Sequence, residues 1–134
     1  MAKTRKSKRP EEDKEREDRI IMEIVVDAYD EQERAMGWYY YLDDKIAFPF
    51  TAICDAEREM SPLSVGERVE VTGMAHEETC QAEIFVKVRY GGGKKQTLAV
   101  PLMQLAPTDD VDDDDTREAV EDWRYWAGRG YRFG

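Results

Sequence analysis

The chain has 134 residues, a mass of 15.6 kDa and a formal net charge of −10, with 41% hydrophobic and 37% charged residues. This is the size of about one domain, with a small core and a strongly ionic surface. Residues 1–19 hold eight Lys or Arg against six Asp or Glu, whereas residues 20–134 hold twelve against twenty-four. A body of that charge repels nucleic acid and anionic membranes and attracts cations or basic partners.

The composition also excludes several classes of protein. No apolar run approaches the roughly 20 residues of a membrane span, and the N-terminus lacks the apolar core of a signal peptide. Two cysteines, Cys54 and Cys80, do not make a disulfide framework, so a reduced cytoplasmic compartment is expected. Residues 1–18 contain almost no aliphatic side chains and are expected to form a disordered charged arm, which leaves one domain over residues 19–134.

Two short helices are predicted after the arm, over about residues 19–29 and 31–44. Apolar residues recur at four-residue spacing in the first, and an i, i+3, i+4, i+7 stripe runs through the second. Asp30 stands three residues before Glu33, the capping-box spacing that satisfies two backbone N–H groups at a helix start. The pattern therefore predicts that a new helix begins just after Asp30.

Alternating apolar residues predict four strands, at 46–54, 67–73, 84–90 and 97–103. Pro49 confines the first strand to an edge or makes it the start of the strand, and a Gly-rich turn at 91–95 joins the last two as a hairpin. Short strands with tight turns indicate a small, strongly bent antiparallel sheet or barrel. A final helix is predicted over residues 116–127, so the fold class is α+β.

An acidic run precedes this final helix, with six aspartates among the seven residues 109–115. Clustered carboxylate oxygens are the donors that calcium and magnesium select. Carboxylates at a helix N-terminus are also favourable without any metal, because the helix dipole places partial positive charge there. The run alone therefore leaves both readings open.

Two further acidic groups are candidate ligands. Asp43 and Asp44 close the second predicted helix at its negative end, where carboxylates are unfavourable, so a bound cation would account for them better than stability does. Glu118, Glu121 and Asp122 share one face of the final helix, since they lie at i, i+3 and i+4. Salt bridges to Arg117 or Arg124 are the alternative for this face.

A partial EF-hand register supplies acids at positions 1, 3, 5, 9 and 12 of a calcium loop: Asp110, Asp112, Asp114, Glu118 and Glu121. Asp115 stands where the loop requires glycine, and the preceding segment is strand and turn instead of an entering helix. A true EF-hand is therefore not expected. Zinc bound by His76, Cys54 and Cys80 lacks a fourth soft ligand, and no motif supports catalysis by Cys80 with His76.

The stretch from Asp27 to Phe50, with Gly37-Trp-Tyr-Tyr-Tyr-Leu-Asp-Asp-Lys45 at its centre, resembles a known family. This is the family of small calcium-binding proteins typified by the cyanobacterial protein CcbP. Similar patterns occur at 61–66, at 98–102 and at 119–126, so the resemblance spans roughly Ile20 to Phe133. It implies an acidic, SH3-like β-barrel with flanking helices that binds calcium without an EF-hand.

The sequence thus predicts a non-enzymatic, intracellular calcium-binding protein, acting as a buffer or sensor through clustered carboxylates. The predicted metal ligands are Asp43, Asp44, Asp112, Asp114, Glu118, Glu121 and Asp122. The alternative is an acidic module that docks basic protein partners without metal. Nucleic acid is not an expected partner of the folded domain, and neither is a membrane.

Overall fold

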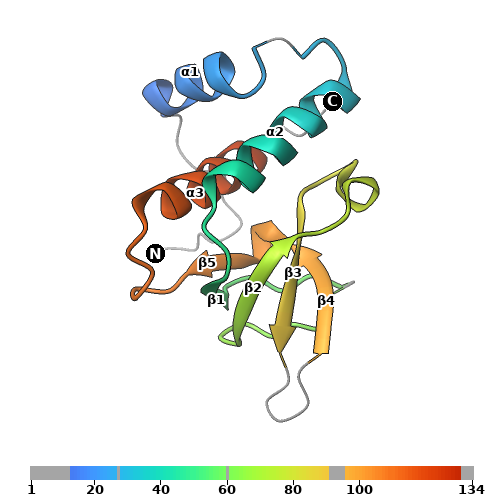
Figure 1. Ribbon diagram of the computed structural model, residues 1–134, viewed down its shortest axis with the longest axis vertical. Coiled ribbons are helices and arrows are strands. Elements are labelled where there is room, and N and C mark those ends of the chain that lie inside the picture. The colour runs from blue at the N-terminus through green and yellow to red at the C-terminus, as the bar shows by residue number, and fades with distance from the viewer. Residues whose placement is uncertain (1–12, 27, 60, 91–95, 131–134) are drawn as a thin grey trace, which may run out of the picture.

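The computed structural model describes residues 13–26, 28–59, 61–90 and 96–130. Three layers are visible: an antiparallel sheet, the paired helices α2 and α3 above it, and α1 on the far side of that pair (Figure 1). The Gly-rich turn at 91–95 and most of the charged arm, residues 1–12, lie outside the described residues. Among the described residues, no helix is both long and apolar enough to cross a membrane.

Helix α1 spans Lys14–Glu23 and begins five residues earlier than the sequence predicted. The side chain of Asp13 caps it by accepting a hydrogen bond from the backbone N–H of Arg16. The last residues of the expected arm are therefore helical. Ile20 and the C-cap residue Ile24 are buried, whereas the rest of the helix is polar or exposed.

Helix α2 spans Glu31–Lys45 and confirms the predicted start. The Asp30 carboxylate accepts from the Glu33 N–H at 2.8 Å, and the Glu33 carboxylate reaches back to the N–H of Tyr29 at 2.6 Å. The stripe at Ala35, Trp38 and Leu42 is buried. Local signals alone therefore place this helix.

The sheet contains five strands in the order β4-β3-β2-β1-β5, and all neighbours are antiparallel. They are β1 Phe50–Cys54, β2 Arg68–Met74, β3 Phe85–Tyr90, β4 Gln96–Pro101 and β5 Leu105–Pro107. Strand β1 begins directly after Pro49, one of the two positions that the sequence allowed. The sequence missed β5, because a strand of three residues is too short to show alternation.

The expected SH3-like barrel is not confirmed, since the sheet is open. Strand β4 pairs with β3 and strand β5 with β1, so β4 and β5 form opposite edges. The 3-10 helix η2, Leu102–Gln104, separates these two strands along the chain. Helix α3, Asp114–Gly128, packs against η2 and β5 on one side and α2 on the other. The α+β fold class is confirmed, and the closed barrel is not.

The core lies between the sheet and the α2–α3 pair. Trp38 of α2 and Trp123 of α3 are both fully buried, and their rings meet edge to face with centroids 5.1 Å apart. Val71, Val86 and Val100 supply the facing apolar surface of the sheet. Burial of two indole rings at the seam between these helices fixes the relative position of α2 and α3.

Candidate functional site

The acidic run surrounds a hollow at the start of α3. This hollow has a volume of about 270 Å³ and is lined by the start of β1 and by three aspartates: Asp110, Asp112 and Asp113. The residues before β1, Ala47 and Pro49, form its other wall. The structure thus brings the aspartates against a second segment that lies some sixty residues away in the chain.

Asp113 is the N-cap of α3 and links this hollow to α2. Its carboxylate accepts hydrogen bonds from the backbone N–H of Thr116 at 2.9 Å and from the Thr116 hydroxyl at 2.6 Å. These bonds hold the pKa of Asp113 below its ordinary value. The Thr116 Oγ1 atom also accepts from the N–H of Ala47 at 2.9 Å, so the chain leaving α2 is tied to the start of α3.

Asp110 lies near the beginning of the loop between β5 and α3, where Thr108 holds its side chain. The Thr108 hydroxyl donates to its carboxylate, and this bond is the main reason that its pKa is lowered. Arg68 of β2 approaches Asp110 at 3.6 Å. The guanidinium of Arg117 donates to the carbonyl oxygens of Val111, at 2.7 Å, and of Thr108. An arginine from α3 therefore braces the backbone of the acidic loop.

Asp43 and Asp44 are exposed on the last turn of α2. The next residue, Lys45, approaches Asp115 of α3 at 3.9 Å, which brings the end of α2 beside the acidic run. Asp112 and Asp114 are exposed as well. The end of α2, which carries two of the seven predicted ligands, thus lies beside the acidic run, which carries two more.

The other three predicted ligands face a different neighbour. Asp122 is fully buried. Its carboxylate accepts hydrogen bonds from both terminal nitrogens of Arg19, at 2.9 and 2.7 Å, and from the Tyr41 hydroxyl at 2.8 Å. Glu118 lies 3.7 Å from Arg19, and Glu121 lies 3.8 Å from Arg16. Basic side chains of α1 therefore neutralise this face. The face does form salt bridges, but not with the arginines that the sequence suggested: Arg117 donates to backbone carbonyls and Arg124 pairs with Asp55.

Burial and the bond to Asp122 raise the pKa of Tyr41 well above its ordinary value. The tyrosine therefore stays protonated and remains a donor to the carboxylate. Sequence reasoning missed Arg16, Arg19 and Tyr41 as partners of this face, because Arg16 and Arg19 lie more than a hundred residues from Asp122. The only signal was the pair of arginines three residues apart on one helix face.

The soft-ligand alternative finds no geometric support. The imidazole of His76 accepts from the N–H of Glu78 and caps η1, Glu77–Cys80. Cys54 and Cys80 are buried and not disulfide-bonded, and burial raises the pKa of the Cys80 thiol. Within the described part of the chain, no three His, Cys, Asp or Glu side chains come close enough together to hold a metal ion as they stand.

The region between α2 and α3 still has the donor chemistry that a hard cation requires. The carboxylates of Asp112 and Asp114 are exposed, so their rotamers can change, and the segment before β1 lines the hollow beside the acidic run. Sequence reasoning left Asp110 and Asp113 out of the ligand set. Their signal was their place within the run, but only the fold shows that they line the hollow.

Comparison with known proteins gives two kinds of match. A family model described as "Calcium binding" matches residues 18–127. The chain is 42% identical to Anabaena CcbP, with a TM-score of 0.78 over 92% of this chain and 98% of that one. It is 44% identical to a protein described as "Calcium binding protein in the calcium-binding form", with a TM-score of 0.78 over 90% of this chain and 95% of that one. No curated protein matches the chain.

Proposed function

The chain belongs to the calcium-binding protein family typified by CcbP, and from this premise we propose that it binds calcium where the end of α2 meets the start of α3. The ion would be held by Asp110 and Asp112, which line the hollow, and by Asp114 in the first turn of α3, together with Asp43 or Asp44. Backbone carbonyls and water would complete the roughly six to eight oxygens that calcium takes.

The observation that carries this proposal is the hollow of about 270 Å³ between the β1 start and the α3 start. Three aspartates from one loop line it, and Lys45, which directly follows the exposed pair at the end of α2, lies 3.9 Å from Asp115. Like charges on one short loop repel one another, so a divalent cation would relieve the repulsion. A site that gathers its carboxylates only when the ion arrives fits the exposed, unclustered side chains of the structure.

The proposed site does not include the three predicted ligands on the face of α3. Asp122 is buried against Arg19, and any ion there would have to displace a bidentate ion pair. Glu118 and Glu121 lie beside the same group of arginines. We therefore assign Asp122 to holding α1 in place and regard Glu118 and Glu121 as matched controls.

We infer a non-enzymatic buffer or sensor that does not use an EF-hand. The support is that the acidic loop follows β5, so no helix enters it. Calcium coordinated there would join α2 to α3 and stabilise the fold by mass action. At a calcium concentration about 100 times the dissociation constant, this linkage is worth roughly 2.7 kcal/mol.

Calorimetric titration of calcium into the apo protein at about 0.15 M monovalent salt tests the proposal. Micromolar-range binding is expected for the wild type. Asp110→Asn combined with Asp112→Asn should weaken it about tenfold or more. Glu118→Gln combined with Glu121→Gln removes the same charge and should leave affinity within about twofold. Equal weakening by both pairs would reduce the effect to net charge and overturn the assigned site.

A further inference from the structure

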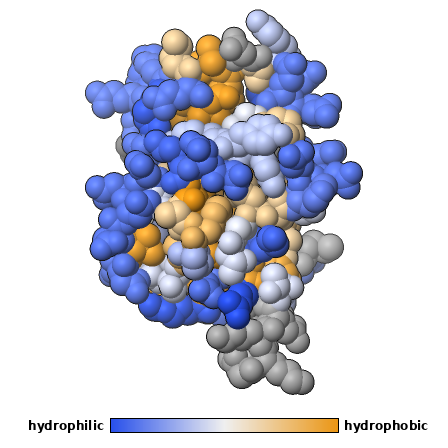
Figure 2. Space-filling view, in the orientation of Figure 1, coloured by the Kyte–Doolittle hydropathy of each residue, from blue (hydrophilic) through white to orange (hydrophobic). Residues whose placement is uncertain are grey.

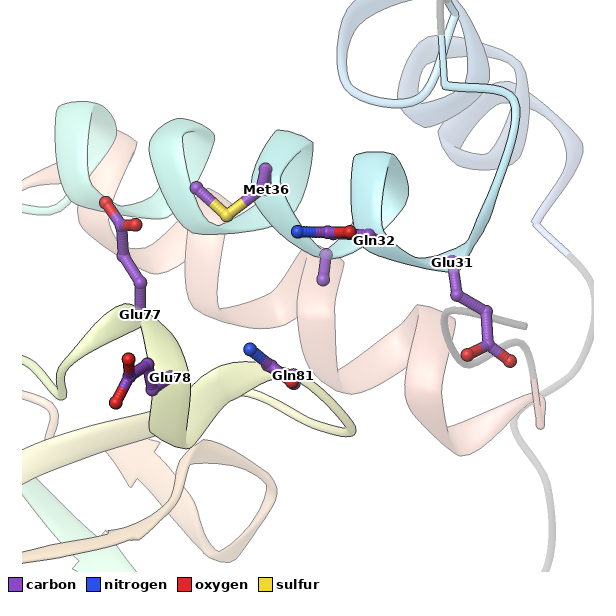
Figure 3. Close-up of a pocket in the computed structure, with 7 residues that line it drawn as sticks. Glu31, Gln32, Met36, Glu77, Glu78 and Gln81 are labelled. Atoms are coloured by element: carbon purple, nitrogen blue, oxygen red, sulfur yellow. The ribbon is translucent and has the colours of Figure 1, made fainter.

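A second groove runs along the first half of α2, away from the proposed calcium site. It consists of two hollows that share Gln32 and Met36, one of about 640 Å³ toward the α1–α2 turn and one of about 250 Å³ toward η1. In the second hollow, Met36 and Gln32 of α2 face Glu77, Glu78 and Gln81 of η1 (Figure 3). The two hollows are neighbours on α2, because Gln32 and Met36 line both of them.

Five apolar residues line the two hollows and are here called the floor of the groove: Ile24, Val26, Ala28, Ala35 and Met36. Six large apolar side chains are exposed among the described residues, and four of them lie in residues 21–29. These four are Ile21, Met22, Val26 and Tyr29, with exposed fractions of 43%, 66%, 52% and 86%. Apolar surface accordingly gathers at the α1 end of the molecule (Figure 2). A patch of this kind, rimmed by polar residues, is typical of an interaction site.

The rim of the groove is acidic and carries five carboxylates: Asp30, Glu31, Glu33, Glu77 and Glu78. No Lys or Arg is among the described residues that line either hollow. Asp30 and Glu33 accept hydrogen bonds from backbone N–H groups at the start of α2, and Glu77 accepts one from the Tyr40 hydroxyl at 3.2 Å. These donors are neutral, so they orient the carboxylates without cancelling their negative charge.

We propose that this groove docks a basic, amphipathic peptide segment of a partner protein. Its apolar side chains would lie on the floor, where Met36 adapts to their shape, and its Lys and Arg side chains would face the five carboxylates. A groove with an apolar floor and one sign of charge on its rim is the geometry that receives an amphipathic helix. The proposal stands on residues apart from the calcium ligands, so either one can fail alone.

Charge decides against a second copy of this chain as the occupant. In a two-fold symmetric dimer the same surface meets itself, so the acidic rims would face each other. Like charges placed together at an interface are unfavourable. The same argument excludes a nucleic acid, whose phosphates repel an acidic rim.

Fluorescence anisotropy of a labelled leucine–lysine peptide, about 18 residues long with leucines at helical spacing, tests the docking on the full chain. A scrambled peptide keeps the composition and charge but loses the apolar face. A leucine–glutamate peptide keeps the face and reverses the charge. We expect the amphipathic basic peptide to bind about tenfold tighter than either control. Equal binding of the scrambled peptide would mean unspecific charge attraction and overturn the proposal.

Two variants locate the binding. Glu77→Gln with Glu78→Gln should weaken the peptide about fivefold to tenfold, and Val26→Ser with Met36→Gln should do the same by removing the apolar floor. The charge-matched control is Glu67→Gln with Glu70→Gln, near the start of β2 and away from its η1 end. Each variant must melt like the wild type, so that a loss of peptide binding is not a loss of folding. Equal loss in the control, or no loss in either groove variant, overturns the proposal, and so does self-association that the peptide cannot displace.

Discussion

The guanidinium of Arg19 and the carboxylate of Asp122 form a two-bonded ion pair, with Nη1–Oδ2 at 2.9 Å and Nη2–Oδ1 at 2.7 Å, between helices α1 and α3. Tyr41 of α2 donates to the same carboxylate, so one buried aspartate touches all three helices. Around it, Arg16 contacts both Asp122 and the ring of Tyr125. Helix α1 is therefore held by charge together with the two isoleucines that it buries.

Removing the charge of Asp122 should destabilise the protein strongly. Asp122→Asn leaves Arg19 facing a neutral group in a partly buried position, and breaking a buried ion pair in this way costs about 3 kcal/mol. Urea unfolding with a linear extrapolation measures it. The adjacent Glu121→Gln changes an exposed carboxylate and should cost less than about 0.5 kcal/mol. Similar costs for the two variants would mean that burial of Asp122 does not matter.

Asp43→Asn with Asp44→Asn should lower calcium affinity without loss of apo stability. Both carboxylates lie on the last turn of α2, where the helix dipole is unfavourable to negative charge. Apo stability should therefore stay unchanged or rise by a few tenths of a kcal/mol. Titration calorimetry and melting curves measure the two effects. Destabilisation of the apo protein by about 1 kcal/mol or more would assign the pair a structural role.

Glu57→Gln with Glu59→Gln is the control for this pair. These two exposed glutamates lie between β1 and β2, and the double substitution removes the same charge as the one at Asp43 and Asp44. Calcium affinity should stay within about twofold of the wild type, since exposed charges at a distance are screened by salt.

Trp123→Ala should cost about 3–5 kcal/mol, because it empties a fully buried site at the α2–α3 seam. It should also weaken calcium binding without removing a ligand, since the acidic run leads into the helix that Trp123 anchors. The same direction is expected for Trp126→Ala. Denaturant unfolding and calcium titration measure both effects, and Trp123→Phe, which keeps a ring, should lose less of each. Full calcium affinity in the Trp123→Ala protein would mean that calcium binding does not depend on the position of α3.

Gly37→Ala should destabilise the protein although alanine favours helices. A Cβ atom at Gly37 would lie 2.6 Å from the carbonyl oxygen of Ile24, in the chain that follows α1. Overpacking of this kind costs about 1–3 kcal/mol, more than the gain of about 1 kcal/mol in helix propensity. Gln32→Ala in the same helix is exposed and should change stability by less than about 0.5 kcal/mol. A more stable Gly37→Ala protein would contradict the close approach.

The helix cap at Asp113 should contribute stability only above acidic pH. Its pKa is lowered in the folded protein, so its contribution is complete above the unfolded-state value near 3.9 and is lost as pH falls through the folded-state value. Asp113→Asn still caps but does not titrate. At about pH 7 the wild type should melt higher. The difference should vanish by about pH 3, and a difference that persists there would contradict the titration of Asp113.

Local sequence determined the start of α2 and the positions of most strands. Asp30 and Glu33 fix the start of α2 because both partners of a capping box lie within one helical turn. Val86 and Val88 are buried as their alternation predicts. The beginning of α1 escaped prediction. A helix so rich in charge resembles a disordered arm as long as the partners of its arginines are unknown.

The tertiary structure decided which acids remain available to a cation. Asp112, Glu118 and Asp122 are the same chemistry in the sequence, yet Asp112 is exposed beside a hollow while Asp122 is fully buried against Arg19. Pairing of strands also kept the sheet open, since it is set by contacts between distant segments. Caps and alternation act over a few residues and can be read along the chain. Neutralisation of a carboxylate depends on a partner that only folding brings near, here more than a hundred residues away.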